Sequence, residues 1–183
     1  MGARIRTATI EDAGAIAHVQ VESWKTTYAG IMPDVFLSLL KVEDRAQRWR
    51  ELILAGDALN FVAEDDDCTA GFVSGGPLRE TIVGYDAELY AIYLLKQYQR
   101  RGVGRALVHM LADALRTQGS NTMLVWVLAQ NPAVSFYQRL GGVQIAQKTI
   151  EIGGASLEEL AFGWASLDDL AERANSGLDR LIP

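Results

Sequence analysis

The stretch YQRRGVGRALVHML, residues 98–111, decides the fold that this sequence predicts. From Val103 to Ala114 the apolar residues recur at the spacing of one helical face. The run before it, AELYAIYLL at residues 87–95, is rich in aromatic and branched residues and predicts a strand. A strand-to-helix joint that carries three arginines and two glycines therefore lies in a chain whose net charge is −6.

This joint has the chemistry of an anion site. The N-terminus of a helix offers unpaired N–H groups and a partial positive charge. Gly102 and Gly104 leave the backbone open to a close approach, and Arg100, Arg101 and Arg105 add full positive charges. The joint therefore suits a phosphate or a pyrophosphate. A tight turn that carries a solvated arginine cluster is the alternative interpretation.

Two familiar phosphate loops are excluded by the residues that follow Gly104. A P-loop has Lys and then Ser or Thr at this point, where Arg105 and Ala106 stand. A dinucleotide fingerprint needs a small residue at the place that Leu107 fills. If the joint binds a phosphate, it therefore does so as a different kind of loop.

The rest of the chain predicts a mixed α/β sheet with a central parallel part and helices on both sides. Thr9 and Asp12 form a capping box for a helix that runs to about Trp24. Asn131 is expected as the N-cap of a later helix, with Pro132 at its first position. The other predicted helices are 33–40, 43–55 and 166–174, and the other predicted strands are 3–10, 60–64, 70–78, 123–128, 143–152 and 156–164.

Length and composition indicate one domain, residues 1–165, followed by a tail, residues 166–183, that forms a short helix. The acidic balance argues against binding to nucleic acid or to an anionic membrane, and no apolar run reaches the roughly 20 residues that span a bilayer. Cys68 is the single cysteine, so an internal disulfide is impossible and a cytoplasmic location is expected. His18 and His109 lack further ligands nearby, so no metal is expected.

The motif at residues 99–104, QRRGVG, matches the pattern Q/R-x-x-G-x-G/A. It resembles the acetyl-CoA signature of the GNAT superfamily of N-acetyltransferases. The segment QNPAVSFYQRLGG, residues 130–142, is similar to the Asn…Phe-Tyr…Leu-Gly segment of the same family. The resemblance covers roughly residues 3–164. It implies a GNAT-like acyl-CoA N-acyltransferase fold and direct transfer of the acetyl group of acetyl-CoA, with no metal, to a primary amine of a small molecule or peptide.

The resemblance also implies a set of site residues. Backbone groups of Ile92, Tyr93 and Leu94 are expected to pair with the pantetheine arm, and Asn131 is expected to bond to it. Tyr137 stands where the family often has the acid that protonates the departing thiolate, and Glu88 has the spacing of a general-base glutamate. The pyrophosphate is expected at the amides of Arg100, Arg101, Gly102, Val103, Gly104 and Arg105, and Gln99 is expected among the residues that bind the cofactor.

The chain departs from the family pattern at two places. The usual spacing from Asn to Tyr is seven residues, whereas Tyr137 follows Asn131 by six. Gln130 or a shifted start of the helix are therefore alternatives to Asn131. Gly142 stands where an aromatic residue usually follows Leu-Gly, which affects packing more than chemistry.

The acceptor side is less well defined by the sequence. Trp24 and Tyr28 are expected to form an aromatic wall for the amine, with core packing as the alternative for Trp24. Glu22 is a second carboxylate that could line this side, and Trp126 is expected in the core.

Acetyl transfer sets three chemical demands that these residues could meet. An amine like that of lysine costs about 4–5 kcal/mol to deprotonate at pH 7, so Glu88 is expected to accept a proton, through water. A backbone N–H at the edge of residues 92–94 could stabilise the charge on the thioester oxygen. Tyr137, whose ordinary pKa is about 10, could protonate the sulfur.

Other functions remain in competition at this stage. A non-catalytic module that binds acyl-CoA would keep the glycine joint and would not need Glu88 or Tyr137. Nucleic-acid binding through the arginine cluster would require an affinity that is sensitive to salt. An exposed sheet edge and the tail helix also permit a homodimer.

Overall fold

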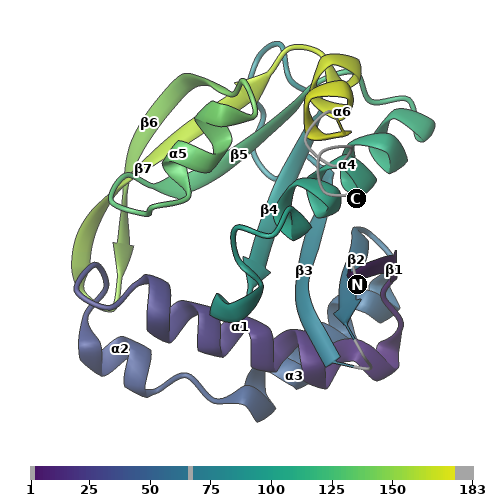
Figure 1. The fold of residues 1–183 in the computed structure, drawn as a ribbon. Coiled ribbons are helices and arrows are strands. Elements are labelled where there is room, and N and C mark those ends of the chain that lie inside the picture. The colour runs from purple at the N-terminus through teal and green to yellow at the C-terminus, as the bar shows by residue number, and fades with distance from the viewer. Residues whose placement is uncertain (1–2, 66–67, 176–183) are drawn as a thin grey trace.

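The computed structural model describes residues 3–65 and 68–175, in which seven strands form one mixed sheet (Figure 1). The strand order is β1-β2-β3-β4-β5-β7-β6. The pair β4 and β5 is parallel, and every other neighbouring pair is antiparallel. The strands are β1 Arg4–Thr7, β2 Leu59–Asp65, β3 Cys68–Pro77, β4 Ala87–Leu94, β5 Met123–Leu128, β6 Val143–Ile152 and β7 Ala155–Trp164.

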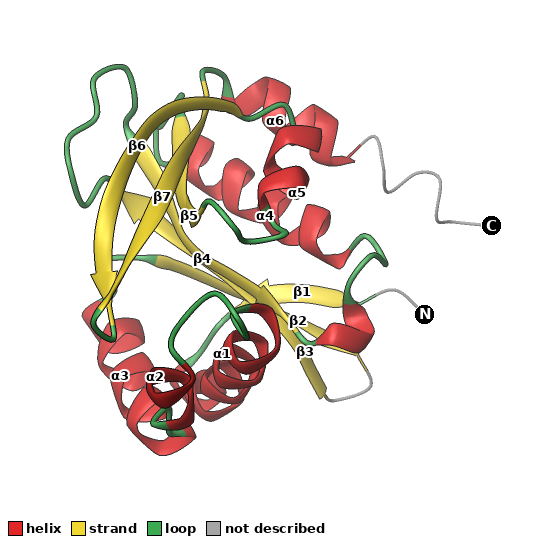
Figure 2. Cartoon of the chain, turned by 90° about the vertical axis from the view of Figure 1, so that its left-hand side faces the viewer, coloured by secondary structure: helices red, strands yellow, loops and turns green. Residues whose placement is uncertain are grey.

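Helices cover both faces of this sheet (Figure 2). One face carries α1 Ala13–Thr27, α2 Asp34–Ser38 and α3 Val42–Ala55. The other face carries α4 Val103–Thr117, α5 Val134–Arg139 and α6 Leu167–Asn175. Short 3-10 turns, η1 Ile10–Asp12 and η2 Lys96–Tyr98, precede α1 and the α4 loop. The predicted fold class, a mixed sheet flanked by helices, is confirmed.

The core consists of three clusters of buried apolar residues. The largest lies between the sheet and α4, α5 and α6, and includes Leu107, Leu111 and Phe162. A second lies under α1 and α3, and a third joins the end of α1, α2 and the β6–β7 hairpin. The amphipathic pattern of α4 thus buries its apolar side, as predicted from the sequence.

The parallel pair β4–β5 is short and opens at one end. Three residue pairs are in register, and the last of these joins Leu89 to Val125. At the closed end the Asp86 carboxylate accepts bonds from the backbone N–H groups of Asn121 and Thr122, both at 3.0 Å. Beyond Leu89 the two strands are no longer paired, and a bulge at Tyr90 changes the register of β4 against β3. This opening positions the candidate site.

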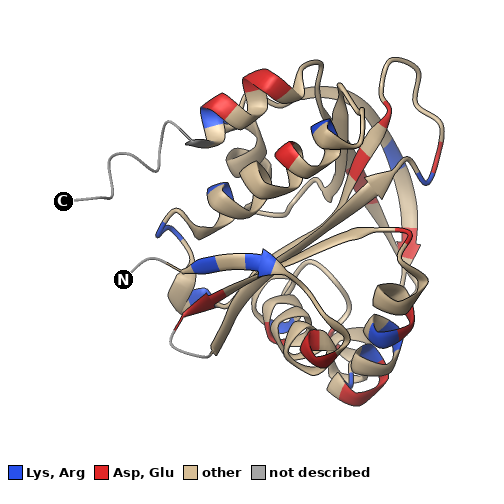
Figure 3. Cartoon of the chain, turned by 90° about the vertical axis from the view of Figure 1, so that its right-hand side faces the viewer, with Lys and Arg blue, Asp and Glu red and all other residues tan. Residues whose placement is uncertain are grey.

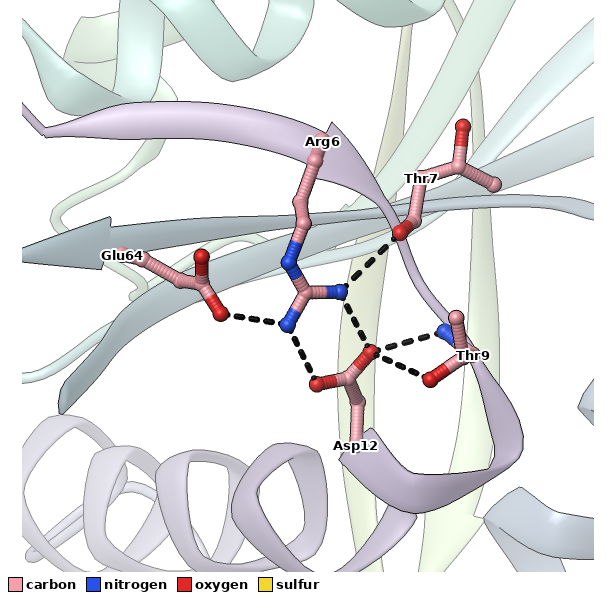
Figure 4. Close-up of polar contacts among 5 residues, drawn as sticks. All are labelled: Arg6, Thr7, Thr9, Asp12 and Glu64. Atoms are coloured by element: carbon pink, nitrogen blue, oxygen red, sulfur yellow. Dashed lines mark hydrogen bonds and ion pairs between the residues drawn. The ribbon is translucent and has the colours of Figure 1, made fainter. Parts of the chain in front are cut away.

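An ion-pair cluster fixes the start of α1 to the sheet edge (Figure 4). The Arg6 guanidinium on β1 donates to both Asp12 carboxylate oxygens, at 2.7 and 2.8 Å, and also bonds to Glu64 on β2. Asp12 accepts the backbone N–H of Thr9 at 2.7 Å, so the predicted capping box is present. The hydrogen bonds from Arg6 hold the pKa of Asp12 below its usual value.

Several predicted boundaries move. Helix α1 runs to Thr27 rather than Trp24. The prediction that Asn131 is an N-cap with Pro132 in the first turn is wrong, because α5 begins only at Val134. Asn131 instead closes a turn before the helix, in which its side chain accepts the N–H of Ala133 at 2.8 Å. Residues 66–67 of the acidic turn and residues 176–183 of the tail lie outside the described residues.

Gly142, where the family usually has an aromatic residue, has no room for a side chain. A Cβ at this position would lie 2.9 Å from the ring of Trp164 and 3.0 Å from the carbonyl oxygen of Tyr137. Trp164 donates its indole N–H to the Leu140 carbonyl at 2.9 Å and fills this space. Trp164 thus supplies from β7 an aromatic ring beside the position after Leu-Gly.

Charged residues of both signs are interspersed along the chain (Figure 3). Helix α3, for example, carries Glu43 and Asp44 next to Arg45, and Arg48 close to Glu51. In the described part of the chain, none of the helices combines the length and the apolar character that crossing a membrane requires.

Candidate active site

A cavity of about 760 Å³ lies where β4 and β5 separate. Its walls include the end of α1, the N-terminal turn of α4, α5 and the β6–β7 hairpin. Residues 89–94 of β4 and 125–128 of β5 line it from the two sides of the gap. The strands are unpaired here, and residues from both faces of the sheet, such as Tyr28 after α1 and Arg105 on α4, line the cavity.

The glycine joint forms one end of the cavity. Arg100 and Gly102 both have left-handed backbone, with φ of 61° and 83°, and Gly102 is the N-cap of α4. Left-handed residues of this kind are common in loops whose backbone N–H groups bind anions. Arg100 and Arg105 of this joint line the cavity, as do the cations Lys96, just before the joint, and Arg139 on α5.

The structure does not bring every residue of the motif to the cavity. Gln99, Arg100, Gly102, Gly104 and Arg105 line it. Two motif residues point elsewhere, since the Arg101 guanidinium lies 5.9 Å from the centre of the Tyr98 ring and Val103 is buried in the main core.

The open edge of β4 also lines the cavity. Ile92, Tyr93 and Leu94 all contribute to its wall. The Leu94 carbonyl already accepts two bonds, one from Ser23 Oγ at 3.1 Å and one from Gln99 Nε2 at 3.2 Å. These bonds connect the last residue of the strand to α1 and to the glycine joint.

The phenols of Tyr28 and Tyr93 form a polar network at the cavity wall. The hydroxyls of Tyr28 and Tyr93 are 3.3 Å apart, and Asn131 Nδ2 donates to the Tyr28 hydroxyl at 3.1 Å. Burial raises the pKa of Tyr28, although its bonds to Tyr93 and Asn131 oppose the rise. Trp24 packs edge-on against Tyr28 with ring centres 5.5 Å apart. The expected aromatic wall of Trp24 and Tyr28 therefore does border the cavity.

The structure shows where the three alternatives at the Asn motif lie, namely Asn131, Gln130 and a shifted start of the helix. Asn131 is buried and lines the cavity. Gln130 is exposed, and it is not among the described residues that line the cavity. The start of α5 has shifted, and this shift carries Tyr137 onto the inner side of the helix.

Tyr137 lies at the cavity wall with its ring in the core. It is 4% exposed and packs between Phe162 and Trp164, with ring centres 6.4 and 6.1 Å away. Burial raises the pKa of its hydroxyl far above the usual value. The group is therefore a neutral phenol at physiological pH and has a proton to give.

Glu88 and Glu22 are not brought to the cavity. The Glu88 carboxylate is 2% exposed and is held by Arg79, whose backbone N–H and Nε donate to it at 3.1 and 3.0 Å. Glu22 lies on the surface in a 3.7 Å ion pair with Lys25. Neither residue is among the described ones that line the cavity. The Arg79 bonds leave Glu88 poorly placed to accept a further proton.

Three cavity residues were not predicted from the sequence. Trp126 was expected in the core, yet it lines the cavity with the Lys148 ammonium 4.1 Å from its ring centre. Arg79 and Glu159 also line the cavity. Leu160 and Phe162 are the apolar residues of one face of β7, so Glu159 lies on the other face. This alternation was the signal in the sequence that could have identified Glu159.

Within the described residues, no group of three or more His, Cys, Asp or Glu side chains has an arrangement that could hold a metal ion.

A glycine-rich helix start beside a gap between two parallel strands can be compared with known proteins. The sequence profile described as "Acetyltransferase (GNAT) family" matches residues 22–142. The chain belongs to this family. It is an N-acetyltransferase by family, and its GNAT relatives lend no support to a non-catalytic binding module.

Relatives match over most of this GNAT chain. An uncharacterized N-acetyltransferase of Bacillus subtilis (strain 168), YuaI, is 42% identical over 93% of the chain and 98% of its own length. The spermidine N(1)-acetyltransferase of Thermoplasma acidophilum is 26% identical over 77% of the chain and 88% of its own length.

Solved structures of other proteins share the GNAT fold. The PaiA N-acetyltransferase of Thermoplasma acidophilum, in complex with coenzyme A, has a TM-score of 0.67 at 26% identity and covers 87% of this chain and 98% of its own. YncA of Salmonella typhimurium, with acetyl-CoA, has a TM-score of 0.70 at 25% identity, with 92% and 95% covered.

Proposed function

We propose that this protein transfers the acetyl group of acetyl-CoA directly to a primary amine of a small molecule or peptide. The observation that carries the proposal is the cavity between β4 and β5, which joins a cationic glycine joint to the buried Tyr137 phenol. Two GNAT structures of similar fold hold coenzyme A or acetyl-CoA, which supports the choice of donor.

The diphosphate of acetyl-CoA would bind at the glycine joint. Arg100 and Arg105 of the joint line the cavity, and the left-handed backbone at Arg100 and Gly102 is of the kind that anion-binding loops use. A Cβ at Gly104 would lie 3.5 Å from Phe136 and 3.6 Å from Leu94, so a longer side chain would enter the cavity. The joint thus fits a diphosphate as long as position 104 stays small.

The pantetheine arm would follow the unpaired edge of β4 at Ile92–Leu94, with Asn131 beside it. This edge has lost its β5 partner, so a ligand could take the place of the missing strand. The thioester would then lie in the gap near Tyr137. A neutral phenol there can protonate the sulfur as the carbon–sulfur bond breaks.

The acceptor is proposed only as a class, a primary amine. One GNAT relative is named for spermidine, and the relative in Salmonella typhimurium, 33% identical over 55% of this chain, is named for an alanine of ribosomal protein bS18. Both substrates present a primary amine. The cytoplasmic location and the homodimer stay predictions from the sequence.

A charge placed in the proposed diphosphate site tests the function. Gly104→Glu should weaken acetyl-CoA binding by about 100-fold or more, about 2.8 kcal/mol, because the carboxylate would repel the diphosphate. Isothermal titration calorimetry with acetyl-CoA measures this effect. Gly14→Glu is the matched control, because Gly14 on α1 has open space around it and is not among the described residues that line the cavity. Normal affinity in a folded Gly104→Glu variant contradicts the proposed binding site.

A further inference from the structure

Among the described residues that line the cavity, Glu159 is the one that carries a carboxylate. The others with charge are the cations Arg79, Lys96, Arg100, Arg105 and Arg139. A cavity lined in this way favours an anion at the glycine joint and leaves Glu159 as the group that can attract a cation. Because an amine acceptor arrives as an ammonium ion, the position of Glu159 bears on how the acceptor binds.

Glu159 belongs to the sheet face opposite to α4. It stands directly across from Leu128 on β5, so the two side chains share a face, and Trp126 shares that face with Ala161. Lys148 lies over the Trp126 ring, and Leu128 packs with Tyr28 in the third cluster. The glycine joint opens α4 on the other face. Donor and acceptor would therefore enter from opposite faces and meet in the gap.

The carboxylate of Glu159 is shielded from water and weakly paired. Its side chain is 18% exposed, and its contact with Lys148 Nζ spans 4.0 Å. Lys148 makes a shorter bond, 2.9 Å, to Glu80. Arg79, the other cation on this side, is held by Glu88. Both cations therefore have closer partners, and Glu159 can accept a hydrogen bond from an incoming ammonium group.

Charged groups from several elements act on Glu159. Burial raises the pKa of its carboxyl, and Lys148 and Arg79 oppose the rise, while Glu88 and Glu80 add to it. The charge of Glu159 raises the pKa of the Tyr28 hydroxyl, and Tyr28 in turn raises the pKa of the Tyr137 hydroxyl. Tyr28 is thus within electrostatic reach of both Glu159 and Tyr137. The groups that face Glu159 are Lys148 from β6, Arg79 and Glu80 from the β3–β4 connection, Glu88 from β4 and Tyr28 after α1.

We propose that Glu159, rather than Glu88, binds the acceptor's ammonium group and takes the proton that must leave before the nitrogen can attack. The inference rests on the proposed acetyl transfer. The ammonium N–H bond breaks and its proton passes to the carboxylate. The nitrogen lone pair then forms the bond to the thioester carbon, and the carbon–sulfur bond breaks with its electron pair on sulfur.

The remaining protons balance as follows. The Tyr137 hydroxyl gives its proton to the sulfur, and the nitrogen loses a second proton that restores the phenol. Glu159 releases its proton to water. The products are the N-acetyl amine, coenzyme A thiol and one proton, and neither a metal nor a redox partner enters the balance.

The test compares Glu159→Gln with wild type over a range of pH. Acetyl transfer is followed by thiol release with spermidine, 1,4-diaminobutane, an alanine-first tripeptide and a lysine-containing tripeptide as probes. In wild type, kcat/KM should rise as Glu159 loses its proton and fall again as the amine loses its own, because the ion pair needs a carboxylate and an ammonium. In Glu159→Gln, kcat/KM at pH 7 should fall by about 100-fold or more.

The shape of the pH profile separates this role from a merely structural one. Without Glu159 the enzyme can use only the neutral amine, so kcat/KM of the variant should climb steadily to the pKa of the amine. The affinity for acetyl-CoA should stay within about twofold of wild type, because Glu159 belongs to the sheet face opposite to α4, the helix that begins at the glycine joint. Glu158→Gln is the matched control, since Glu158 is exposed on the same strand and should keep both activity and profile.

Three outcomes decide between the ideas. A Glu159→Gln variant with unchanged kcat/KM and an unchanged profile overturns the proposal while acetyl transfer stands. Loss of the low-pH limb in Glu88→Gln, with that limb retained in Glu159→Gln, also overturns it and assigns the proton to Glu88. If wild-type protein binds acetyl-CoA yet acetylates none of the four probes, the proposed function fails and this inference fails with it.

Discussion

Burial determines what the phenol of Tyr137 can do. An exposed tyrosine would begin to lose its proton near pH 10. The ring of Tyr137 packs between Phe162 and Trp164, and the loss of water around its hydroxyl raises its pKa. The proton therefore stays on the phenol over the whole physiological range. The raised pKa also makes the phenol a weaker acid, so its transfer is driven by the negative charge that develops on the sulfur as the bond breaks.

Replacement of this hydroxyl gives a direct prediction. Tyr137→Phe should lower kcat by about 100-fold or more, because the sulfur would leave without a proton donor. The ring stays in place, so the affinity for acetyl-CoA and the melting temperature should change little. Steady-state kinetics and calorimetry check the two halves. Tyr85→Phe is the control, since Tyr85 packs on Gly163 and is not among the described residues that line the cavity. Equal kcat in Tyr137→Phe and wild type would remove Tyr137 from the mechanism.

The sequence could identify residues whose place depends on a continuous motif. Gly102, Gly104 and Tyr137 stand at fixed distances along the chain from a strand or a helix, so a one-dimensional pattern finds them. Glu159 has no such motif. It reaches the cavity because β7 pairs with β5 in one particular register, with Glu159 opposite Leu128. The alternation in β7 assigns Glu159 to the face opposite Leu160 and Phe162, but it does not show that this face lines a cavity.

At the scale of elements, the position of the cavity depends on how β4 and β5 are held together and then separate. Asp86 precedes β4 and accepts three bonds at the start of β5, from the N–H of Asn121 and from the N–H and hydroxyl of Thr122, all at 3.0 Å. The strands pair for three residues and then diverge. The bonds to Asp86 thus fix the end from which the two strands diverge. Individual strands were predictable, whereas the length of their pairing was not.

Removal of this clamp should weaken the fold in a manner that depends on pH. Burial alone would raise the pKa of Asp86, but the bonds from Asn121 and Thr122 outweigh it and hold the pKa low. A carboxyl with a lowered folded-state pKa stabilises above its ordinary pKa, and this contribution is lost as the pH falls through the folded value. Asp86→Ala should therefore lower the free energy of unfolding by about 1 kcal/mol at pH 7 and by less near pH 3.

Urea unfolding at the two pH values measures this effect. Asp113→Ala is the comparison, because Asp113 is exposed on α4 and pairs with Arg116 at 2.9 Å. An exposed ion pair of this kind contributes about 0.5 kcal/mol or less. If Asp86→Ala is no more destabilising than Asp113→Ala at pH 7, the clamp does not hold the two strands.

At the scale of the whole molecule, the chain's N-terminal and C-terminal parts meet to close the cavity. The third core cluster joins Tyr28, Met32 and Leu37 from the region of α1 and α2 to Ile150 and Leu157 of the β6–β7 hairpin. Figure 1 shows α2 close to the end of this hairpin. Composition and periodicity predicted both parts separately. Their contact was not predictable, because it depends on the tilt of β6 and β7 beyond β5.

Phe36 on α2 is the point at which this contact can be loosened. The Cβ of Phe36 lies close to Gly153 at the hairpin tip. A Cβ added to Gly153 would lie only 2.8 Å from it. Its ring also packs on Trp24, with ring centres 6.3 Å apart. Phe36→Ala should lower the free energy of unfolding by about 1–2 kcal/mol, since the side chain is only half-buried.

Phe36→Ala should weaken the binding of one of the two substrates, the amine. Trp24 and Tyr28 line the cavity on the side that we propose for the acceptor, whereas the glycine joint lies at the start of α4. We therefore expect the KM for the amine to rise by about 5-fold or more, roughly 1 kcal/mol, with an affinity for acetyl-CoA that stays near wild type. Val35→Ala is the matched control on the same helix, because Val35 is 72% exposed. A parallel loss of affinity for both substrates would mean that Phe36 supports the fold as a whole, and that the hairpin contact does not shape the acceptor side.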